Sequence, residues 1–323
     1  MSKRRISKQQ STRIEKIQQD YHQHKQNDDA LIEGLVITRF SKHVEVEDNQ
    51  GNHLRCSIRP NLETLVAGDR VIWQSEGKNQ GVVVSLYPRT SLLAKPTSTG
   101  IKKPVAANIT QLVIVIAAKP EPSWPLLDSY LVMAETLQLN AVILLNKTDL
   151  PCESLKDRLF EHYENLNYPI LLMNQHSSTG LEQLKKVLNH QVSVFVGQSG
   201  VGKSSLIAGI LPHEQNIATK ELSEISELGQ HTTSNSRYYH LPSGGALIDS
   251  PGVREFSLWY IDMAEIARGY IEFRPYLSQC KFRNCTHKDT PHCAIIHAVG
   301  KGLISIKRYE NFIKLCDQYD SIR

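Results

Sequence analysis

The stretch Gly197–Ser205 combines glycines with a lysine and serines at the spacing of a phosphate-binding loop. Its sequence, Gly-Gln-Ser-Gly-Val-Gly-Lys-Ser-Ser, fits the pattern G-x-x-x-x-G-K-[ST]. The glycines let the backbone wrap a phosphate chain with its N–H groups pointing inward. Lys203 can reach the β- and γ-phosphates, and the Ser204 hydroxyl can ligate Mg²⁺. We therefore predict that a nucleoside triphosphate contacts Gly197, Gln198, Ser199, Gly200, Val201, Gly202, Lys203, Ser204 and Ser205.

A second polar set has the types and order of a base-recognition motif. Its members form the pattern N-K-x-D and are Asn146, Lys147, Thr148 and Asp149. Guanine presents two adjacent donors, N1–H and the 2-amino group, and the carboxylate of Asp149 can accept both, whereas adenine offers no such pair. Alone, such a tetrapeptide is most often a solvated turn. In a chain with a phosphate loop, it predicts selection of guanine over adenine.

A third set, Asp249-Ser-Pro-Gly252, ends an apolar run and fits D-x-x-G. This pattern suits a carboxylate near Mg²⁺ and a glycine N–H near the γ-phosphate. Upstream, residues 214–233 contain few core residues, so we expect a mobile loop in which Thr232 or Thr233 senses the γ-phosphate. The predicted magnesium ligands are Ser204, Thr233 and Asp249.

The residue after D-x-x-G is Val253, where Ras-like enzymes place a glutamine that positions the attacking water. A valine side chain has no polar atom, so we predict slow intrinsic hydrolysis. We hypothesise that His231 orients the water once a partner orders the loop; a solvated loop histidine is the alternative. The predicted catalytic residues are His231, Lys203, Thr232 and Thr233.

Three of the chain's six cysteines lie close together near the C-terminus with a histidine between them. Cys280, Cys285, His287 and Cys293 offer a closed tetrahedral Cys₃His set for one structural Zn²⁺, while His292 is a competing ligand. A disulfide is the weaker alternative in the cytosol. Basic residues surround the cluster and predict an RNA-facing surface: Arg274, Lys281, Arg283, Lys288, Lys301, Lys307 and Arg308. The other cysteines, Cys56, Cys152 and Cys316, are predicted to be buried thiols.

The elements that position these residues divide the chain into parts. Residues 1–29 are polar and basic, which predicts a flexible tail that is either plain disorder or an arm on RNA. Residues 30–93 contain five short alternating segments, typical of an OB-type barrel, a fold that binds oligonucleotides in many proteins but can also be purely structural. The composition of residues 94–104 predicts a linker.

Residues 105–260 alternate buried strands and helices, as in a doubly wound sheet. Strands are expected at 111–116, 141–145, 168–173 and 192–196, followed by two more at 237–241 and 246–248. By position the base loop is Asn174, Gln175 and His176. The base motif precedes the phosphate loop, whereas the usual order is the reverse, so we predict a circular permutation. Residues 261–323 form the zinc-binding, mainly helical end.

A permuted GTPase between an OB-like barrel and a Cys/His tail resembles the small-ribosomal-subunit-dependent GTPases of bacteria, the RsgA/YjeQ family. The fold class is therefore α/β: a circularly permuted P-loop GTPase domain with an N-terminal OB-fold β-barrel and a C-terminal zinc-binding, mainly helical domain. The resemblance implies GTP as substrate, GDP as product, stimulation by the 30S subunit and a role in late 30S maturation with contacts to 16S rRNA. It also supports the role of His231.

The chain of 323 residues, with a net charge of +4, contains no apolar run near the length of a membrane span and begins with a polar, basic segment. We expect a cytoplasmic monomer with no membrane partner. Three alternatives remain at this stage: a P-loop ATPase or kinase of a small substrate, an RNA-binding P-loop NTPase acting outside the ribosome, and an RNA-binding module whose nucleotide site is only structural.

Overall fold

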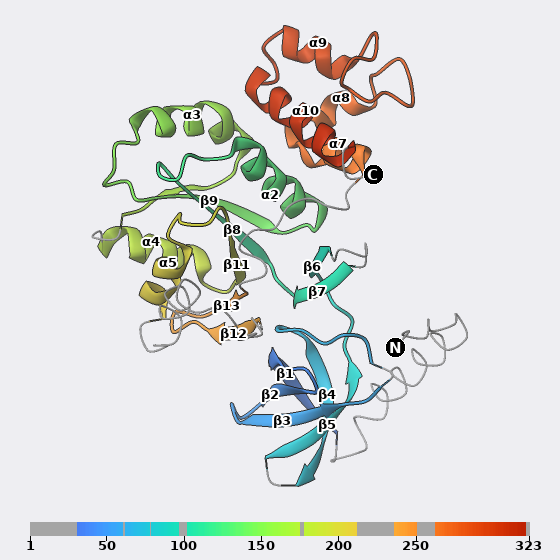
Figure 1. The fold of residues 1–323 in the computed structure, drawn as a ribbon, viewed down its shortest axis with the longest axis vertical. Coiled ribbons are helices and arrows are strands. Elements are labelled where there is room, and N and C mark those ends of the chain that lie inside the picture. The colour runs from blue at the N-terminus through green and yellow to red at the C-terminus, as the bar shows by residue number, and fades with distance from the viewer. Residues whose placement is uncertain are drawn as a thin grey trace, which may run out of the picture.

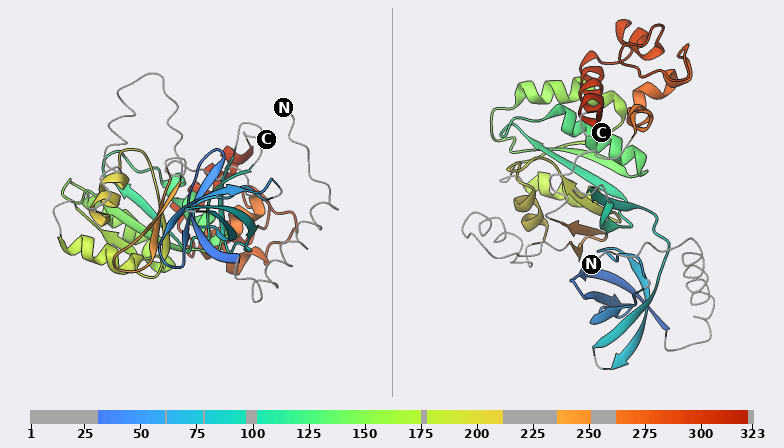
Figure 2. Two further views of the ribbon diagram at one scale, coloured as in Figure 1. Left: turned by 90° about the horizontal axis from the view of Figure 1, so that it is seen from below. Right: turned by 45° about the vertical axis from the view of Figure 1, so that its right-hand side comes forward.

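The structure is a computed structural model that describes residues 31–60, 62–77, 79–96, 102–174, 178–211, 236–250 and 262–320. It has three parts along its long axis (Figure 1). A small barrel lies at one end, a sheet covered by helices lies in the middle, and a helical region built from residues 262–320, here called the C-terminal region, lies at the other end. The right-hand view of Figure 2 shows the same order from a second direction, and the left-hand view looks along the long axis.

The barrel has five strands. They are β1 (Leu31–Arg39), β2 (His43–Asp48), β3 (His53–Ile58), β4 (Arg70–Gly77) and β5 (Gln80–Leu86). Strand β1 pairs with both β2 and β4, while β3 pairs in parallel with β5, so the sheet closes on itself. Alternate side chains of β3, those of Leu54 and Cys56, point into the core, as period-two patterning requires. The predicted five-stranded barrel is confirmed.

A two-stranded ribbon connects the barrel to the middle of the molecule. Strand β6 (Leu92–Pro96) pairs antiparallel with β7 (Lys102–Ala107). This ribbon occupies much of segment 94–104, for which composition predicts a linker. The apolar side chains of Leu93 and Val105 enter the core beneath the sheet, and this burial stabilises the two strands. Their lysines and prolines are uncommon in strands, so the sequence does not predict them.

The central sheet contains β8 (Gln111–Ala117), β9 (Asn140–Asn146), β10 (Ile170–Leu172), β11 (Val192–Val196), β12 (Arg237–His240) and β13 (Ala246–Asp249). The order is β10-β9-β8-β11-β13-β12, and only β12 runs antiparallel to its neighbour among these strands. Every residue of β8 is buried, as expected for a strand covered on both faces. The carboxyl ends of β8, β9, β11 and β13 therefore lie along one edge of the sheet.

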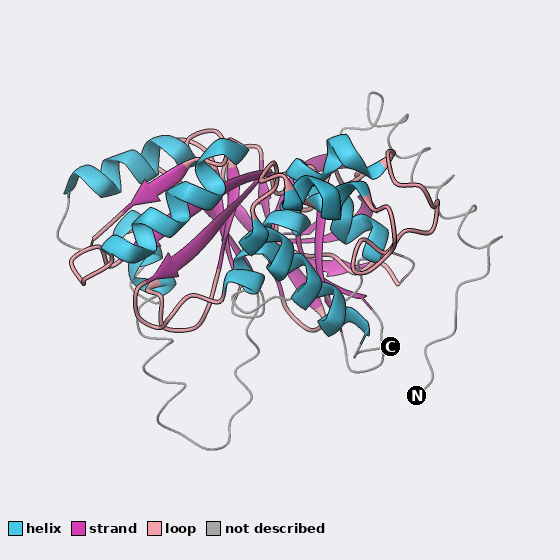
Figure 3. Ribbon diagram, turned by 90° about the horizontal axis from the view of Figure 1, so that it is seen from above, coloured by secondary structure: helices cyan, strands magenta, loops and turns pink. Residues whose placement is uncertain are grey.

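Among the described residues, two helices cover each face of this sheet. Helices α2 (Trp124–Thr136) and α3 (Glu153–Tyr163) pack on one face, and α4 (Ser178–Leu188) and α5 (Lys203–Ile210) pack on the other. A short 3₁₀ turn, η2 (Glu164–Leu166), follows α3. Figure 3, viewed from above, shows helices lying over the strands of the sheet. This three-layer arrangement confirms the predicted α/β class.

The barrel joins the central sheet through strand β12. Strand β1 pairs antiparallel with β12 at Thr38 and Arg237, so the barrel and the central sheet form one continuous eleven-stranded sheet. Thr38 Oγ1 donates to the carbonyl of Ser236 at 2.9 Å, and Arg237 binds Glu45 at 2.8 Å. A second contact, between His240 Nε2 and Glu47 Oε2 at 2.7 Å, lies beside the first.

The C-terminal region packs against α2. Its elements are α7 (Met263–Gly269), η3 (Ile271–Phe273), α8 (Arg274–Leu277), α9 (Ala294–Gly300) and α10 (Ile306–Asp320). Its core is aromatic, with Tyr270, Phe273 and Phe312 in mutual ring contact. Asp262 and Glu265 form a capping box that begins α7. In the part of the chain that the structure describes, no helix has the length and apolar character of a membrane span.

Candidate nucleotide site and metal cluster

The phosphate loop lies between the end of β11 and the start of α5, at the carboxyl edge of the sheet. Gly197, Gly200 and Gly202 have φ angles of 140°, 77° and 94°, a region that favours glycine. A Cβ on Gly197 would lie 2.2 Å from the Val115 carbonyl oxygen. The loop can therefore approach the neighbouring strand only because this residue has no side chain.

Lys203 is buried at the base of this loop. Its Nζ donates to the carbonyls of Gly197 at 2.8 Å and Gln198 at 2.5 Å. Ser204 and Asp249 are buried close to the same edge, because Asp249 ends β13, which pairs in parallel with β11. The predicted phosphate and magnesium residues of the described part of the chain thus gather at one edge.

The base motif meets the phosphate loop directly. Asn146 is fully buried and donates from Nδ2 to the carbonyl of Val201 at 2.9 Å. Lys147 donates from Nζ to the carbonyl of Gly200 at 2.6 Å. A Cβ on Gly202 would lie 2.4 Å from Asn146 Nδ2, so the third loop glycine makes this contact possible. Two motifs separated by some fifty residues are therefore in direct contact.

The side-chain oxygen of Asn146 lacks a hydrogen-bond donor among the described residues. Asn146 Oδ1 is buried and accepts no hydrogen bond from the described residues. A buried acceptor without a donor is unfavourable, and a donor from a bound ligand or an ordered water would satisfy it. This observation fits a site that is completed by a small molecule.

The base end of the site contains an exposed acidic residue. Asp149 is exposed on the turn after β9, and the Thr148 N–H donates to the carbonyl of Met173 at 3.0 Å, which ties this turn to the next strand end. Asn174, the first residue of the predicted base loop, is half-buried there. Gln175 and His176 lie outside the described residues, as do His231, Thr232, Thr233, Gly252 and Val253.

Sequence reasoning missed a segment that borders the phosphate loop. Residues 119–123 lie between β8 and α2, and their backbone accepts from Lys147 and contacts the side chain of Gln198. Gln198 is among the predicted nucleotide contacts, but the motif pattern leaves position 198 unspecified, so the spacing gives no signal for the contacts of its side chain with this segment.

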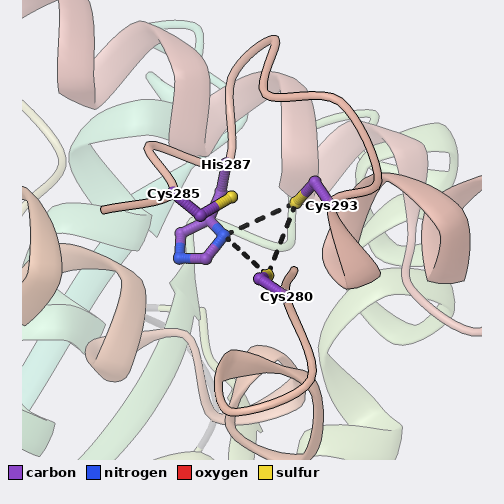
Figure 4. Close-up of side chains that lie close together, drawn as sticks. All are labelled: Cys280, Cys285, His287 and Cys293. Atoms are coloured by element: carbon purple, nitrogen blue, oxygen red, sulfur yellow. Dashed lines mark hydrogen bonds between the residues drawn. The ribbon is translucent and has the colours of Figure 1, made fainter. Parts of the chain in front are cut away.

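The four predicted zinc ligands come together in the C-terminal region (Figure 4). One ligand atom from each of Cys280, Cys285, His287 and Cys293 lies within 4.8 Å of all the others. His287 Nδ1 is 3.6 Å from the Cys280 sulfur and 3.5 Å from the Cys293 sulfur. The competing residue His292 is exposed and is not a member of this group. Of the two histidines, His287 is therefore the one that this geometry places with the three cysteines.

Burial affects the protonation of two of these groups. It lowers the pKa of His287, which favours the neutral imidazole that binds metals. It raises the pKa of the Cys293 thiol to about 12, so the unligated thiol keeps its proton at neutral pH. A cation at the centre of the cluster would reverse that preference by favouring the thiolate. The donor set of three sulfurs and one nitrogen matches the chemistry of Zn²⁺.

The basic set around the cluster divides by burial. The prediction that Arg308 faces RNA is wrong: its guanidinium is buried and pairs with Asp128 and Glu272. Charge alone does not reveal burial, and the partner Asp128 is 180 residues away in the chain. Three others pair with acids in the structure: Arg274, Lys288 and Lys307. Of these paired residues, Arg274 and Lys307 are still exposed, and the remaining members are exposed as well: Lys281, Arg283 and Lys301. The three cysteines predicted to be buried are so: Cys56, Cys152 and Cys316.

The sequence model of a family described as RsgA GTPase matches residues 86–259, more than half of the chain. The chain belongs to the RsgA GTPase family. It is therefore a GTPase, a hydrolase that acts on GTP.

The small ribosomal subunit biogenesis GTPase RsgA of Photorhabdus laumondii is 42% identical over 341 residues, which cover 100% of this chain and 97% of the relative. RsgA 1 of Vibrio parahaemolyticus is 43% identical over 97% of this chain and 91% of its own.

Solved structures of the RsgA/YjeQ type share the fold. YjeQ from Thermotoga maritima superimposes with a TM-score of 0.74 at 32% identity, covering 91% of this chain and 100% of its own. YloQ, described as a circularly permuted GTPase, superimposes with a TM-score of 0.71 at 25% identity, covering 92% and 98%. The predicted fold class, a permuted GTPase with a barrel before it and a helical Cys/His region after it, is confirmed.

Proposed function

We propose that this chain is a GTPase of small-ribosomal-subunit biogenesis that is stimulated by the 30S subunit and acts late in its maturation. The names of its relatives support the process. The observation that supports the nucleotide site is the direct contact between the two motifs. Asn146 donates a hydrogen bond to the carbonyl of Val201, and Lys147 donates one to the carbonyl of Gly200. Folding joins a base motif and a phosphate motif whose order in the chain is reversed.

At the guanine end, the exposed carboxylate of Asp149 accepts from N1–H and the 2-amino group. Asn146 and Lys147 fix the position of this end relative to the phosphate loop, with Thr148 held between them and the next strand. The base loop completes the pocket with Asn174, Gln175 and His176.

At the phosphate end, the backbone N–H groups of Gly197–Ser205 and the Lys203 ammonium bind the phosphates of GTP or GDP. Ser204, Thr233 and Asp249 would hold Mg²⁺, since hydroxyl and carboxylate oxygens are the ligands that it prefers. When bound, the ion supplies charge neutralisation at the phosphates. Gly252 offers a backbone N–H to the γ-phosphate.

We assign the orientation of the attacking water to His231, with Thr232 and Thr233 sensing the γ-phosphate, because Val253 has no polar atom for this task. Replacing His231 with alanine should abolish most of the partner-stimulated turnover while leaving GDP affinity within about twofold of the wild type. Unchanged stimulated turnover in that variant would assign the water to another group.

The Cys₃His cluster fits one structural zinc ion. All four tetrahedral positions come from the protein, which leaves no open position for a substrate. The loop from 278 to 293 has few buried apolar residues, so metal binding would supply folding energy there.

The RNA-binding surface consists of the exposed cations Lys281, Arg283 and Lys301 together with the barrel. Their partner in this account is 16S rRNA in the 30S subunit, bound by a cytoplasmic, monomeric protein. Such contacts release counterions, so subunit binding should weaken steeply as salt rises.

The deciding experiment measures turnover of GTP and ATP with and without purified 30S subunits. We expect GTP turnover to be slow alone, to rise at least about tenfold with 30S subunits, and to exceed ATP turnover by about a hundredfold or more. Equal turnover rates for ATP and GTP would favour a different P-loop enzyme. A GTP turnover rate that is the same with and without 30S subunits would place the activity outside the ribosome.

A further inference from the structure

The side chain of Gln198 connects the phosphate loop to the segment that leads into α2. Its Oε1 accepts from the backbone N–H of Ser123 at 2.9 Å, and its Nε2 donates to the carbonyl of Glu121 at 3.1 Å. The carbonyl of Gln198 also accepts from Lys203 at 2.5 Å. The same residue thus contacts the phosphate-binding lysine and the start of a helix that lies outside the loop.

A second contact holds the same segment from its other end. Lys147 Nζ, which binds the carbonyl of Gly200, also donates to the carbonyl of Lys119 at 3.1 Å. A cavity of about 380 Å³ lies along this segment and is lined in part by Glu121, Pro122 and Trp124. Hydrogen bonds to Gln198 and Lys147 therefore hold this segment at both of its ends.

Helix α2 begins directly after this segment, with Ser123 as its N-cap. Little more than one turn later, roughly 7 Å along the helix axis, Asp128 is completely buried. Its carboxylate pairs with Arg308 and accepts from Asn311 Nδ2 at 2.8 Å and from the Tyr270 hydroxyl at 3.3 Å. Those three partners all belong to the C-terminal region.

The cluster around Asp128 leaves little freedom. Arg308 also binds Glu272 at 2.7 Å, and its guanidinium lies 4.4 Å from the centre of the Tyr270 ring. Burial lowers the pKa of Arg308, but the carboxylates of Asp128 and Glu272 outweigh this and raise it, so the arginine stays charged. A buried charge that loses a partner is costly, so α2 and the C-terminal region must move together.

We propose that α2 couples the nucleotide site to the C-terminal region, with Gln198 as a positioning residue at the phosphate loop and Asp128 as the anchor at the other end. This inference rests on the GTP site proposed above. Coupling between two sites is reciprocal. Bound nucleotide therefore stabilises the C-terminal region, and loosening the Asp128 cluster weakens nucleotide binding.

The test is a double-mutant cycle on the affinity of the full chain for a fluorescent GDP. Gln198→Met removes both side-chain hydrogen bonds and keeps the length of the side chain. The double variant Tyr270→Phe/Asn311→Leu removes two donors to Asp128 and leaves the Arg308 pair intact, so that the chain still folds. We expect GDP affinity to fall about fivefold in Gln198→Met and about threefold in Tyr270→Phe/Asn311→Leu. The variant that combines all three changes should lose about fivefold rather than fifteenfold, because Gln198→Met alone already disconnects the phosphate loop from α2.

Arg274→Met is the matched control. It breaks a contact between the same two parts, the 2.6 Å pair with Glu135, but at the opposite end of α2 and on the surface. Combined with Gln198→Met, its effect should be additive within about twofold. If both cycles are additive, the coupling is wrong.

Hydrogen exchange provides a readout that a purely local role of Gln198 would not change. Saturating GDP should slow exchange of the α10 amides in the wild type and in Arg274→Met, but not in Gln198→Met. A response of α10 that survives in Gln198→Met overturns the coupling. A wild type that binds no GDP overturns the proposed function as well, whereas GDP binding with additive cycles overturns the coupling alone.

Discussion

The central sheet carries a separate structure at each end, and the two attachments differ in chemistry. The barrel is attached through one strand pair, through the small side chain of Ala67, which enters the core of the central sheet, and through ion pairs that are partly exposed, such as Arg237–Glu45. The C-terminal region is attached through an aromatic core and a buried charge cluster around Arg308. Exposed pairs contribute little and are screened by salt, whereas breaking a buried pair is expensive. The barrel joint is therefore the weaker of the two.

The largest effect is expected at the buried cluster. Arg308→Met should lower the free energy of unfolding by about 3–5 kcal/mol, because it leaves the carboxylate of Asp128 buried without its cation. Urea unfolding would measure this. Arg274→Met, which breaks the surface pair with Glu135, should cost less than about 1 kcal/mol. Equal losses in the two variants would contradict the contrast between buried and exposed attachments.

The metal cluster provides the second test, and it compares two neighbouring histidines. His287→Ala removes a member of the cluster, so the chain should bind zinc more than about tenfold less tightly, and its C-terminal region should become the first site of proteolysis. His292→Ala changes an exposed side chain and should bind zinc as the wild type does. Zinc content and limited proteolysis of both variants measure the effect. Loss of zinc in the His292 variant would revise the ligand set.

The smallest effect is expected at the barrel joint. Glu45→Gln should cost less than about 1 kcal/mol, and the difference from the wild type should shrink in high salt. Burial raises the pKa of Glu45, but hydrogen bonds from Arg237 and His53 outweigh it and lower the pKa below its ordinary value.

The direction of the pH dependence follows from this shift. A carboxylate with a lowered pKa stabilises the folded state above the unfolded pKa and loses that contribution as the pH falls through the folded one. The wild type should therefore lose its advantage over Glu45→Gln progressively as the pH falls below 4.5, the ordinary pKa of a glutamate. Thermal unfolding of both proteins between pH 3 and pH 7 would show it, and an advantage that grows toward low pH would contradict this pairing.

Motifs with fixed spacing could be predicted from the sequence because their chemistry is local. The loop Gly197–Ser205 needs glycines where φ is positive, and the Cys₃His set needs its members within one short stretch. Barrel strands such as β3 are visible as simple alternation of buried and exposed residues. In each case the residues that define the feature are neighbours in the chain.

Features that depend on distant partners and carry no motif could not be predicted. The burial of Arg308 depends on Asp128 in another part of the chain. The role of Gln198 depends on Ser123, 75 residues away, and on a motif position that tolerates any residue. The ribbon β6–β7 depends on apolar contacts with the sheet core that its lysine- and proline-rich sequence does not suggest.

The central claim is that two motifs written in reversed order close around one guanine nucleotide, and base specificity tests it most directly. Xanthine carries a carbonyl where guanine has its 2-amino group. An asparagine at position 149 would accept from N1–H and donate to that carbonyl. The measurement is the affinity of the wild type and of Asp149→Asn for GTP and for xanthosine triphosphate. The wild type should prefer GTP by at least about a hundredfold, and the variant should prefer xanthosine triphosphate. An unchanged preference for GTP in Asp149→Asn would show that the base binds elsewhere.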